Sequence, residues 1–286
     1  MLRMANHVHK KTGMKNLCLG GGVALNGVAN YRILKEGPFE GVHIPPSPGD
    51  GGSAIGCAQY SYFCHAKNKR RREQNVERIQ NNIYVGPSYS NDEIKSFLDT
   101  NKIQYKFIET DLLLKSTAKL ISEGNIVGWF QGKMEWGPRT LGNRSILADP
   151  RDPKMKDILN EKIKHRELFR PFAPSILEEY VSEYFELDIP SPYMLLVAKI
   201  KKPEKIPAVT HVDGTGRLQS VSKEINPLYY DLINEFYKLT SVPVIINTSM
   251  NVMGEPIVNT PEQAYNMILK TDMDYLVMRN YLISRN

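Results

Sequence analysis

The chain has 286 residues, 41% of them hydrophobic and 24% charged, a composition that excludes wholesale disorder and a fibrous repeat. Its formal net charge of +6 permits an acidic partner but does not choose among nucleic acid, nucleotide and phosphorylated metabolite. No apolar run reaches the roughly 18 residues of a membrane span, and the opening "MLRMANHVHKK" lacks the apolar centre of a signal peptide, so we expect a cytoplasmic protein without a membrane partner.

The first elements in the chain repeat one pattern. A strand, a glycine turn and a helix occur twice, as "NLCLGGG" followed by "VALNGVANYRIL", and "GVHIP" followed by "PSPGDGG" and "SAIGCAQYSYFCHA". We expect the first strand to be buried. Both turns place glycines where a backbone can approach a phosphate or metal at a helix N-terminus.

Three cysteines, Cys18, Cys57 and Cys64, lie in this part of the chain. Their odd number argues against a disulfide framework, and the last two, which are seven positions apart, do not match the short CxxC spacing of a zinc site. We expect all three cysteines to be small buried or neutral residues.

A basic run, "HAKNKRRREQNVERIQNN", separates this part from the rest and indicates a linker or an exposed helix end. It could also dock on nucleic acid, although most short basic runs are merely solvated.

The second part continues the alternation of helices and strands. Ser90 and Glu93 form a predicted capping box, and Gly124 ends the helix "DLLLKSTAKLISEG". Further helices are predicted over 154–163, 178–185, 227–239 and 261–269. Strands are predicted at "NIYVG", "IQYKFIE", "NIVGWFQ", "YMLLVAKI", "LQSV", "PVIINTS" and "YLVM". The mixture predicts an α/β or α+β fold with a twisted sheet.

The motif "WFQGKMEWGPRTLGNRSILADPR" places three arginines among glycines and prolines after a predicted strand. We expect Arg139 and Arg144 to project from a loop at the strand end, where sites collect. Forked guanidinium donors match phosphate oxygens, so paired arginines can clamp an anion. Alternatively, they pair with carboxylates such as Glu135 and Asp149 and are structural.

A second cationic cluster follows in "NEKIKHRELFRPFAP", where two prolines forbid continuation of the helix. Arg166 can pair with Glu167, whereas Lys164 and Arg170 have no obvious carboxylate on a shared face. Lys164 and Arg170 are therefore the candidates for an anion site.

Polar residues and a further arginine complete the candidates in this part. In "PVIINTSMNVMGEPIV", short side chains that can donate to phosphate or to a carbonyl oxygen follow the strand, namely Asn247, Thr248, Ser249 and Asn251. The alternative is a hydrogen-bonded turn. In "HVDGTGRLQSV", Arg217 leads into a strand and could reach an anion.

In the first part, Asp50 of "SPGDGG" is either an Asx turn or a metal ligand, and the residues alone favour the turn. "GGGVALN" resembles a phosphate loop but is neither a Walker sequence nor GxGxxG.

Taken together, six motifs in order resemble the O-carbamoyltransferase family of nodulation and antibiotic-tailoring enzymes. They are "LCLGGGVALNGVANYRI", "PPSPGDGGSAIG", "GWFQGKMEWGPRTLGNRSILADPR", "KIKHRELFRPFAPSIL", "HVDGTGRLQSV" and "NTSMNVMGEPIV", and they span nearly the whole chain. Departures are mild: Trp136, Thr140 and Met250 stand where the family pattern has phenylalanine, alanine and phenylalanine.

The resemblance implies that residues 1–75 are the C-terminal part of an actin-like ATPase-superfamily domain related to the tRNA threonylcarbamoyl transferases. Residues 76–82 are then a linker and residues 83–286 a YrdC-like domain. The family's first domain is longer, and its metal-binding HxxxH motif has no counterpart here. The chain therefore resembles the C-terminal half of a longer enzyme, and the missing N-terminal domain is an expected partner.

The resemblance also implies the chemistry. The YrdC-like part activates carbamoyl phosphate with ATP, and with Mg²⁺ as its counterion, to carbamoyl adenylate. The complete enzyme then transfers the carbamoyl group to a hydroxyl of a small molecule. The isolated chain is expected to be limited to the first half-reaction.

Individual roles follow by resemblance. Lys164, Arg170 and Ser249 hold carbamoyl phosphate. Arg139, Arg144 and Arg217 flank it or the ATP phosphates, and the assisting side chains are Asn247, Thr248 and Asn251. Nucleotide contacts are expected from Gly21, Gly22 and Asn26. Asp50 is an expected ligand of Fe(II), whose histidine ligands this chain lacks.

Two other interpretations stay open. The charge permits an RNA- or nucleotide-binding module, but the sequence lacks the interleaved aromatic residues of a base-stacking surface, so we do not expect a nucleic-acid partner. The chain could also be a non-catalytic remnant.

Overall fold

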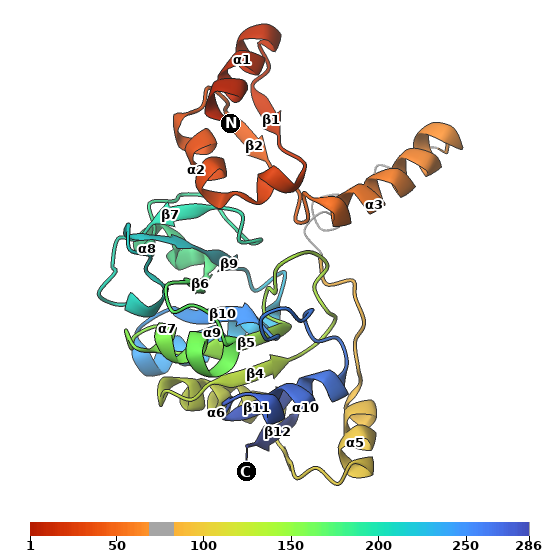
Figure 1. The fold of residues 1–286 in the computed structure, drawn as a ribbon, viewed down its shortest axis with the longest axis vertical. Helices are drawn as coiled ribbons and strands as arrows, with labels where there is room; N and C mark the ends of the chain where they lie inside the picture. Colours follow the sequence, from red (N-terminus) through yellow and green to blue (C-terminus); the bar gives the residue numbers. More distant parts are fainter. Residues whose placement is uncertain (69–82, 286) are drawn as a thin grey trace.

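Two groups of elements make up the part of the chain that the computed structural model describes, residues 1–68 and 83–285 (Figure 1). The first group contains α1 (Leu2–Thr12), β1 (Asn16–Cys18), the 3₁₀ turn η1 (Gly22–Leu25), α2 (Gly27–Glu36), β2 (Gly41–His43), α3 (Asp50–Tyr60) and the π-helical turn η2 (Ser61–His65). The twofold order of strand, turn and helix is confirmed.

The first group has a small core of its own. β1 and β2 pair in parallel, and Ala5, Ile33 and Phe39 are buried together between the helices and strands. The prediction that the first strand is buried is wrong, because Asn16 and Cys18 are exposed and only two strands share this sheet.

Helix α3 points away from the rest of the chain (Figure 1), and none of its residues is buried. The prediction that the cysteines are buried is therefore wrong as well: Cys18, Cys57 and Cys64 are all exposed free thiols. Small and apolar side chains predicted the helix correctly, but they could not reveal how little packs against it.

The second group is a sheet with helices packed on it. Its helices are α5 (Asn91–Thr100), α6 (Thr110–Ser122), α7 (Met155–Ile158), η3 (Leu159–Lys164), η4 (Glu178–Tyr180), α8 (Val181–Tyr184), η5 (Pro207–Val209), α9 (Pro227–Thr240) and α10 (Pro261–Lys270). Its strands are β3 (Lys106–Phe107), β4 (Val127–Phe130), β5 (Arg144–Ala148), β6 (Ala173–Leu177), β7 (Val197–Lys199), β8 (Thr215–Arg217), β9 (Gln219–Val221), β10 (Val244–Ser249), β11 (Tyr275–Met278) and β12 (Tyr281–Ser284).

Eight of these strands form one mixed sheet in the order β3-β12-β11-β4-β5-β10-β6-β9, while β7 and β8 form a separate hairpin. The pairs β11–β4 and β6–β9 are parallel and the others antiparallel. Helices α6 and α9 pack together over β4, β5, β6 and β10, and α10 packs on β4 and β11. This confirms the predicted α/β class; the YrdC-like type stays a prediction.

The predicted boundaries are confirmed where local chemistry fixes them. Ser90 accepts from the Glu93 amide and the Glu93 carboxylate accepts from the Ser90 amide, which is the predicted capping box. Gly124 has a φ of 89° just beyond α6, as a helix stop requires. Strands β5, β6, β8 and β12 were not predicted, and "NIYVG" contributes only an isolated bridge at Tyr84.

The two groups touch beside the β7–β8 hairpin. The buried Asn30 of α2 donates to the Leu195 carbonyl at 2.9 Å, and the Tyr31 hydroxyl donates to the Glu186 carbonyl at 2.8 Å. The predicted linker, residues 76–82, and most of the basic run lie outside the described residues, so the domain boundaries stay a prediction.

Candidate functional site

The sheet brings several of the predicted side chains to one edge. Strand β10 runs antiparallel to β5, so Ser249, at the end of β10, lies opposite Ser145 at the beginning of β5. The loop 131–143, which carries Arg139, leads directly into β5. The polar residues after β10 and the arginine loop therefore meet, as the sequence suggested.

Lys164 is a buried cation beside the end of β10. Only 3% of the residue is exposed. Its ammonium group donates to the Ser249 carbonyl, to the Ser249 hydroxyl at 3.3 Å, and to the carbonyl and side-chain oxygens of Asn251 at 2.9 and 3.1 Å. Burial, and secondarily the charge of Arg166, lowers the pKa of Lys164 to about 7.

The backbone explains how Lys164 reaches this position. It is the last residue of the π-helical turn η3, and His165 beyond it adopts a left-handed conformation with a φ of 48°. The predicted helix 154–163 thus continues to Lys164, and single π-helical turns are frequent at functional sites. The Ser249 hydroxyl donates to Asn251 Oδ1 at 2.6 Å, which closes the ring of oxygens around the ammonium group.

Arg139 and Arg217 form the second part of the site. Burial lowers the pKa of both guanidinium groups, that of Arg217 to about 9 with further contributions from the nearby charges of Arg139 and Arg166. The Nε atoms of Arg139 and Arg217 are buried and have no hydrogen-bond partner among the described residues. Two unsatisfied donors beside each other are costly unless an acceptor reaches them.

Arg166 joins the group, although the sequence also allowed a purely structural ion pair with Glu167. Its charge affects both Lys164 and Arg217, so it lies near both. Its Nε donates to Asn160 Oδ1 at 2.7 Å, and its guanidinium stacks 5.0 Å from the ring centre of Phe172. No carboxylate of residues 1–68 and 83–285 forms an ion pair with Lys164, Arg139, Arg166 or Arg217. We call these four residues the cation group.

Asn247 is held by a buried polar network rather than exposed at the strand end. Its amide donates to Gln219 Oε1 at 2.9 Å and to the Thr140 carbonyl at 3.4 Å, and Ser175 donates to the same Gln219 oxygen. Gln219 was missed by the sequence analysis, because a glutamine in a short strand carries no motif. Thr248 lies next to it, half-buried and paired with Ile146.

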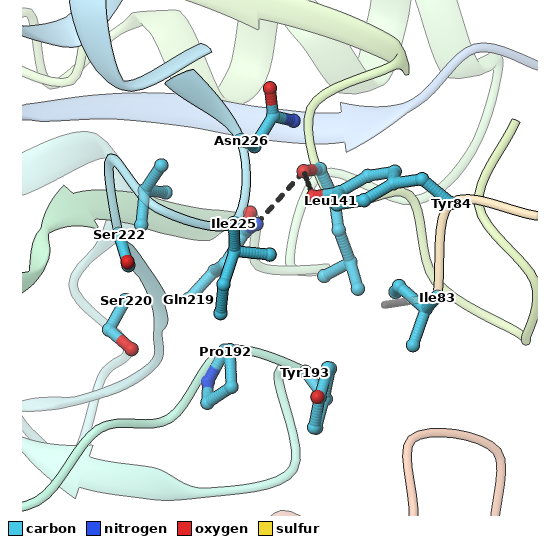
Figure 2. A pocket seen from close by; sticks show the side chains of 11 residues that line it. Ile83, Tyr84, Leu141, Pro192, Tyr193, Gln219, Ser220, Ser222, Ile225 and Asn226 are labelled. Atoms are coloured by element: carbon cyan, nitrogen blue, oxygen red, sulfur yellow. Dashed lines mark hydrogen bonds between the residues drawn. The ribbon is translucent and has the colours of Figure 1, made fainter. Parts of the chain in front are cut away.

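A small pocket adjoins this network (Figure 2). Tyr84 and Tyr193 lie on one side of it and Ser220, Ser222 and other polar side chains on the other. The Tyr84 hydroxyl donates to the Leu141 carbonyl at 2.8 Å, and Gln219 Nε2 donates to the same oxygen at 3.0 Å. Gln219 thus lies between the pocket and Asn247.

Arg144 lies apart from the cation group. It is the first residue of β5, fully buried, and its guanidinium donates to the carbonyls of Gln131, Asn143, Pro87 and Gly132 and stacks 3.7 Å from the centre of the Phe130 ring. The prediction that Arg144 projects from a loop is wrong, because its two terminal guanidinium nitrogens tie the loop to the backbone around it. Its Nε is buried and has no hydrogen-bond partner among the described residues. Its contact with substrate stays an untested prediction.

Arg170 also departs from expectation. Its side chain is 43% exposed, and its Nε lies 2.8 Å from a carboxylate oxygen of Glu167. The prediction that it has no local carboxylate is wrong, since a tight turn after η3 brings the two together. Its charge lowers the pKa of Arg166, so it lies at the outer rim of the cation group.

The candidates of the first group surround its two glycine turns. The Gly21 amide donates to the Pro48 carbonyl at 2.7 Å, and a Cβ added to Gly49 would lie 3.7 Å from Gly22. The turns therefore touch each other, as a shared ligand would need. The Asn26 side-chain oxygen, however, accepts from the Ala29 amide as the N-cap of α2.

Asp50 does not make a metal centre with the described residues. It is the exposed first residue of α3, and no group of three or more His, Cys, Asp or Glu side chains that could hold a metal ion occurs within 1–68 and 83–285. Iron binds tightly only to several converging donors, so these residues do not fit the expected Fe(II) site on their own.

Within the described part of the chain, no helix is both long and apolar enough to cross a membrane.

Comparison with known proteins places these features in context. Residues 118–285 match the family model described as carbamoyltransferase C-terminus, and residues 1–59 match carbamoyltransferase N-terminus. An uncharacterised protein of Synechocystis is 45% identical over the whole chain and 50% of its own length. Nodulation protein NolO of Bradyrhizobium diazoefficiens is 41% identical over 98% of this chain and 51% of its own. The chain spans about half the length of these relatives.

Among solved structures, full-length HypF in a phosphate- and nucleotide-bound form resembles 59% of this chain with 25% of its own length. The TM-score is 0.42 and the sequence identity 21%.

Proposed function

Because the chain belongs to the carbamoyltransferase family, we propose that it activates carbamoyl phosphate with ATP, as part of an O-carbamoyltransferase that modifies a hydroxyl of a small molecule. One water molecule hydrolyses carbamoyl phosphate, so that phosphate leaves and carbamate remains. A carbamate oxygen then bonds to the α-phosphorus of ATP as pyrophosphate leaves, which gives carbamoyl adenylate. Carbamoyl transfer itself is assigned to the complete enzyme.

One observation carries this proposal: Lys164 is buried, the three arginines of the cation group are half-buried, and no described carboxylate forms an ion pair with them. Burial lowers the pKa values of Lys164 and Arg217, and the repulsion of neighbouring cations lowers them further. A bound polyanion removes that repulsion. ATP and carbamoyl phosphate are both anions, so the same charges that destabilise the empty site favour bringing the two reactants together.

We assign a role to each residue of the site from its position. Lys164, Ser249 and Asn251 form one compact cradle, which suits the smaller anion, carbamoyl phosphate. Arg139 and Arg217, whose Nε donors are available, suit the ATP phosphates or the junction between the reactants. Arg170 at the rim is placed to exchange Glu167 for a phosphate. Thr248, half-buried beside Ser249, assists at the end of β10, and Asn247 assists from the buried network that it forms with Gln219.

The phosphates of ATP require a divalent counterion, for which Mg²⁺ is proposed. The Fe(II) expected from the family resemblance is not used in any step, since Asp50 lacks companion ligands in the described residues.

The test is exchange of radiolabelled pyrophosphate into ATP by the purified chain, with and without carbamoyl phosphate. We expect exchange that depends on carbamoyl phosphate. Lys164→Ala and Arg170→Ala should each lower it by tenfold or more, since one contact to a developing charge contributes about 2 kcal/mol. Losses below tenfold would count against the assigned site.

Lys162→Ala is the matched control for Lys164. It removes a lysine from the same turn, but Lys162 is exposed and lies outside the cradle. Its exchange rate should stay within twofold of wild type. A folded chain that binds ATP but never exchanges would indicate a non-catalytic remnant.

A further inference from the structure

The loop that carries Arg139 is stabilised by a carboxylate within it. Glu135 is 5% exposed, and its Oε1 accepts from the backbone amides of Leu141 at 2.8 Å, Asn143 at 2.6 Å and Arg144 at 3.3 Å. A single carboxylate oxygen therefore joins the beginning of the loop to its end. Its Oε2 is buried and has no hydrogen-bond partner among the described residues.

The carbonyl groups of the same part of the loop also accept hydrogen bonds. Tyr84 and Gln219 donate to the Leu141 carbonyl, and Asn247 donates to the Thr140 carbonyl. The two residues that follow Arg139 are thus fixed on both sides. Gly142 adds to this, since its φ of 104° sets a turn that ordinary residues rarely adopt.

Burial lowers the pKa of Arg139, and at Arg144 the charge of Glu135 opposes the effect of burial. Burial raises the pKa of Glu135 itself, and its hydrogen bonds with the loop amides oppose this. The carboxylate therefore holds the loop through backbone amides and not through an ion pair with Arg139.

We propose that Glu135 is a positioning residue of the anion site, which holds the backbone of residues 140–144 so that Arg139 stays within the cation group. The inference rests on the proposed function, because Arg139 must contact an anionic reactant for its position to matter. Glu135 itself contacts no reactant.

The test is a double-mutant cycle of Glu135→Gln and Arg139→Ala, measured as carbamoyl phosphate-dependent pyrophosphate exchange. Glu135→Gln keeps the shape but weakens the acceptor, and should lower exchange about tenfold in the wild-type background. In the Arg139→Ala background it should cost less than twofold, because the residue that it positions is gone. A merely structural glutamate would produce the same loss in both backgrounds.

A second readout follows the backbone directly. Hydrogen exchange of the Leu141 and Asn143 amides should quicken at least tenfold in Glu135→Gln, with α6 amides unchanged. Asp149→Asn is the matched control. It alters another buried carboxylate, which pairs with Arg151, and its effect should be equal with and without Arg139.

If Glu135→Gln does not fold, Tyr84→Phe tests the same loop peptides from their carbonyl side. It removes the hydroxyl that donates to the Leu141 carbonyl and also interacts with Asn226, and it should cost about threefold in wild type and nothing measurable in Arg139→Ala. Wild-type protein without any exchange would overturn the proposed function and this inference together. Exchange in wild type with equal losses in both backgrounds would overturn the inference alone.

Discussion

The buried ammonium group of Lys164 predicts that anion binding is coupled to proton uptake. With a pKa of about 7, Lys164 in the empty site is about one-tenth protonated at pH 8. A single negative charge brought to about 4 Å, at an effective dielectric constant near 20, contributes about 4 kcal/mol, which raises the pKa back to about 10. The bound site is therefore protonated at pH 8.

The direction in which anion affinity changes with pH follows from the lowered pKa of Lys164. Below pH 7 both the free and the bound site carry the proton, so affinity does not depend on Lys164 ionisation. Between about pH 7 and 10 the bound site holds more protons, and affinity should fall up to tenfold per pH unit, or about 1.4 kcal/mol. Above that window the dependence ends.

Calorimetry in buffers of different ionisation enthalpy measures this uptake. The ligand is phosphonoacetamide, an analogue of carbamoyl phosphate with a stable C–P bond. At pH 8 wild type should take up close to one proton per bound ligand, while Lys164→Met should bind more weakly and take up none beyond the ligand's own titration. Equal uptake by both proteins would refute the assignment of Lys164 to the anion.

Three further predictions concern individual contacts. Arg144→Met should lower the free energy of unfolding by about 3 kcal/mol in urea titrations, because it leaves buried carbonyls unpaired. Arg170→Met should change the same quantity by less than about 1 kcal/mol, because its ion pair is exposed. Equal effects of the two substitutions would contradict the buried position of Arg144 and the exposed position of Arg170. Gly142→Ala should cost about 3 kcal/mol or more in the same assay, since the added Cβ would lie 2.2 Å from the Tyr229 ring, and a neutral result would show that the loop relaxes. Ser90→Ala should cost about 1 kcal/mol through loss of the capping box, and no change in the urea midpoint would disprove the cap.

Local patterns predicted the elements that local chemistry determines. The capping box at Ser90, the glycine stop at Gly124 and the long amphipathic helix α9 all depend on neighbours within a few residues. Strand β5 was missed because it gains its identity from pairing with β10, which is distant in sequence. Strand β12 forms a hairpin with β11 directly before it, and the sequence analysis predicted only the first strand of that hairpin.

Some residues of the candidate site could likewise be predicted from local sequence patterns, and others could not. Motif spacing brought out Lys164 and Ser249, and the structure places their polar atoms within 3.3 Å. Arg139, from the loop before β5, and Arg217, the last residue of β8, also lie near each other. Sequence alone could not distinguish these two arginines from Arg144. The sequence does not show whether an arginine side chain donates to backbone carbonyls or has donors available for an anion.

Arg166 and Arg170 also show what the sequence alone could not predict. The carboxylate of Glu167 is adjacent to Arg166 in sequence, but the turn presents it to Arg170. In the empty site the ion pair with Glu167 therefore forms at Arg170 and not at Arg166.

The most direct test of the anion site is a crystal structure of the chain with ATP, Mg²⁺ and phosphonoacetamide. We predict the phosphonate at the cradle of Lys164, Ser249 and Asn251, with the ATP phosphates against Arg139 and Arg217. Both ligands ordered elsewhere, with the cation group left in contact with water alone, would contradict the proposed site.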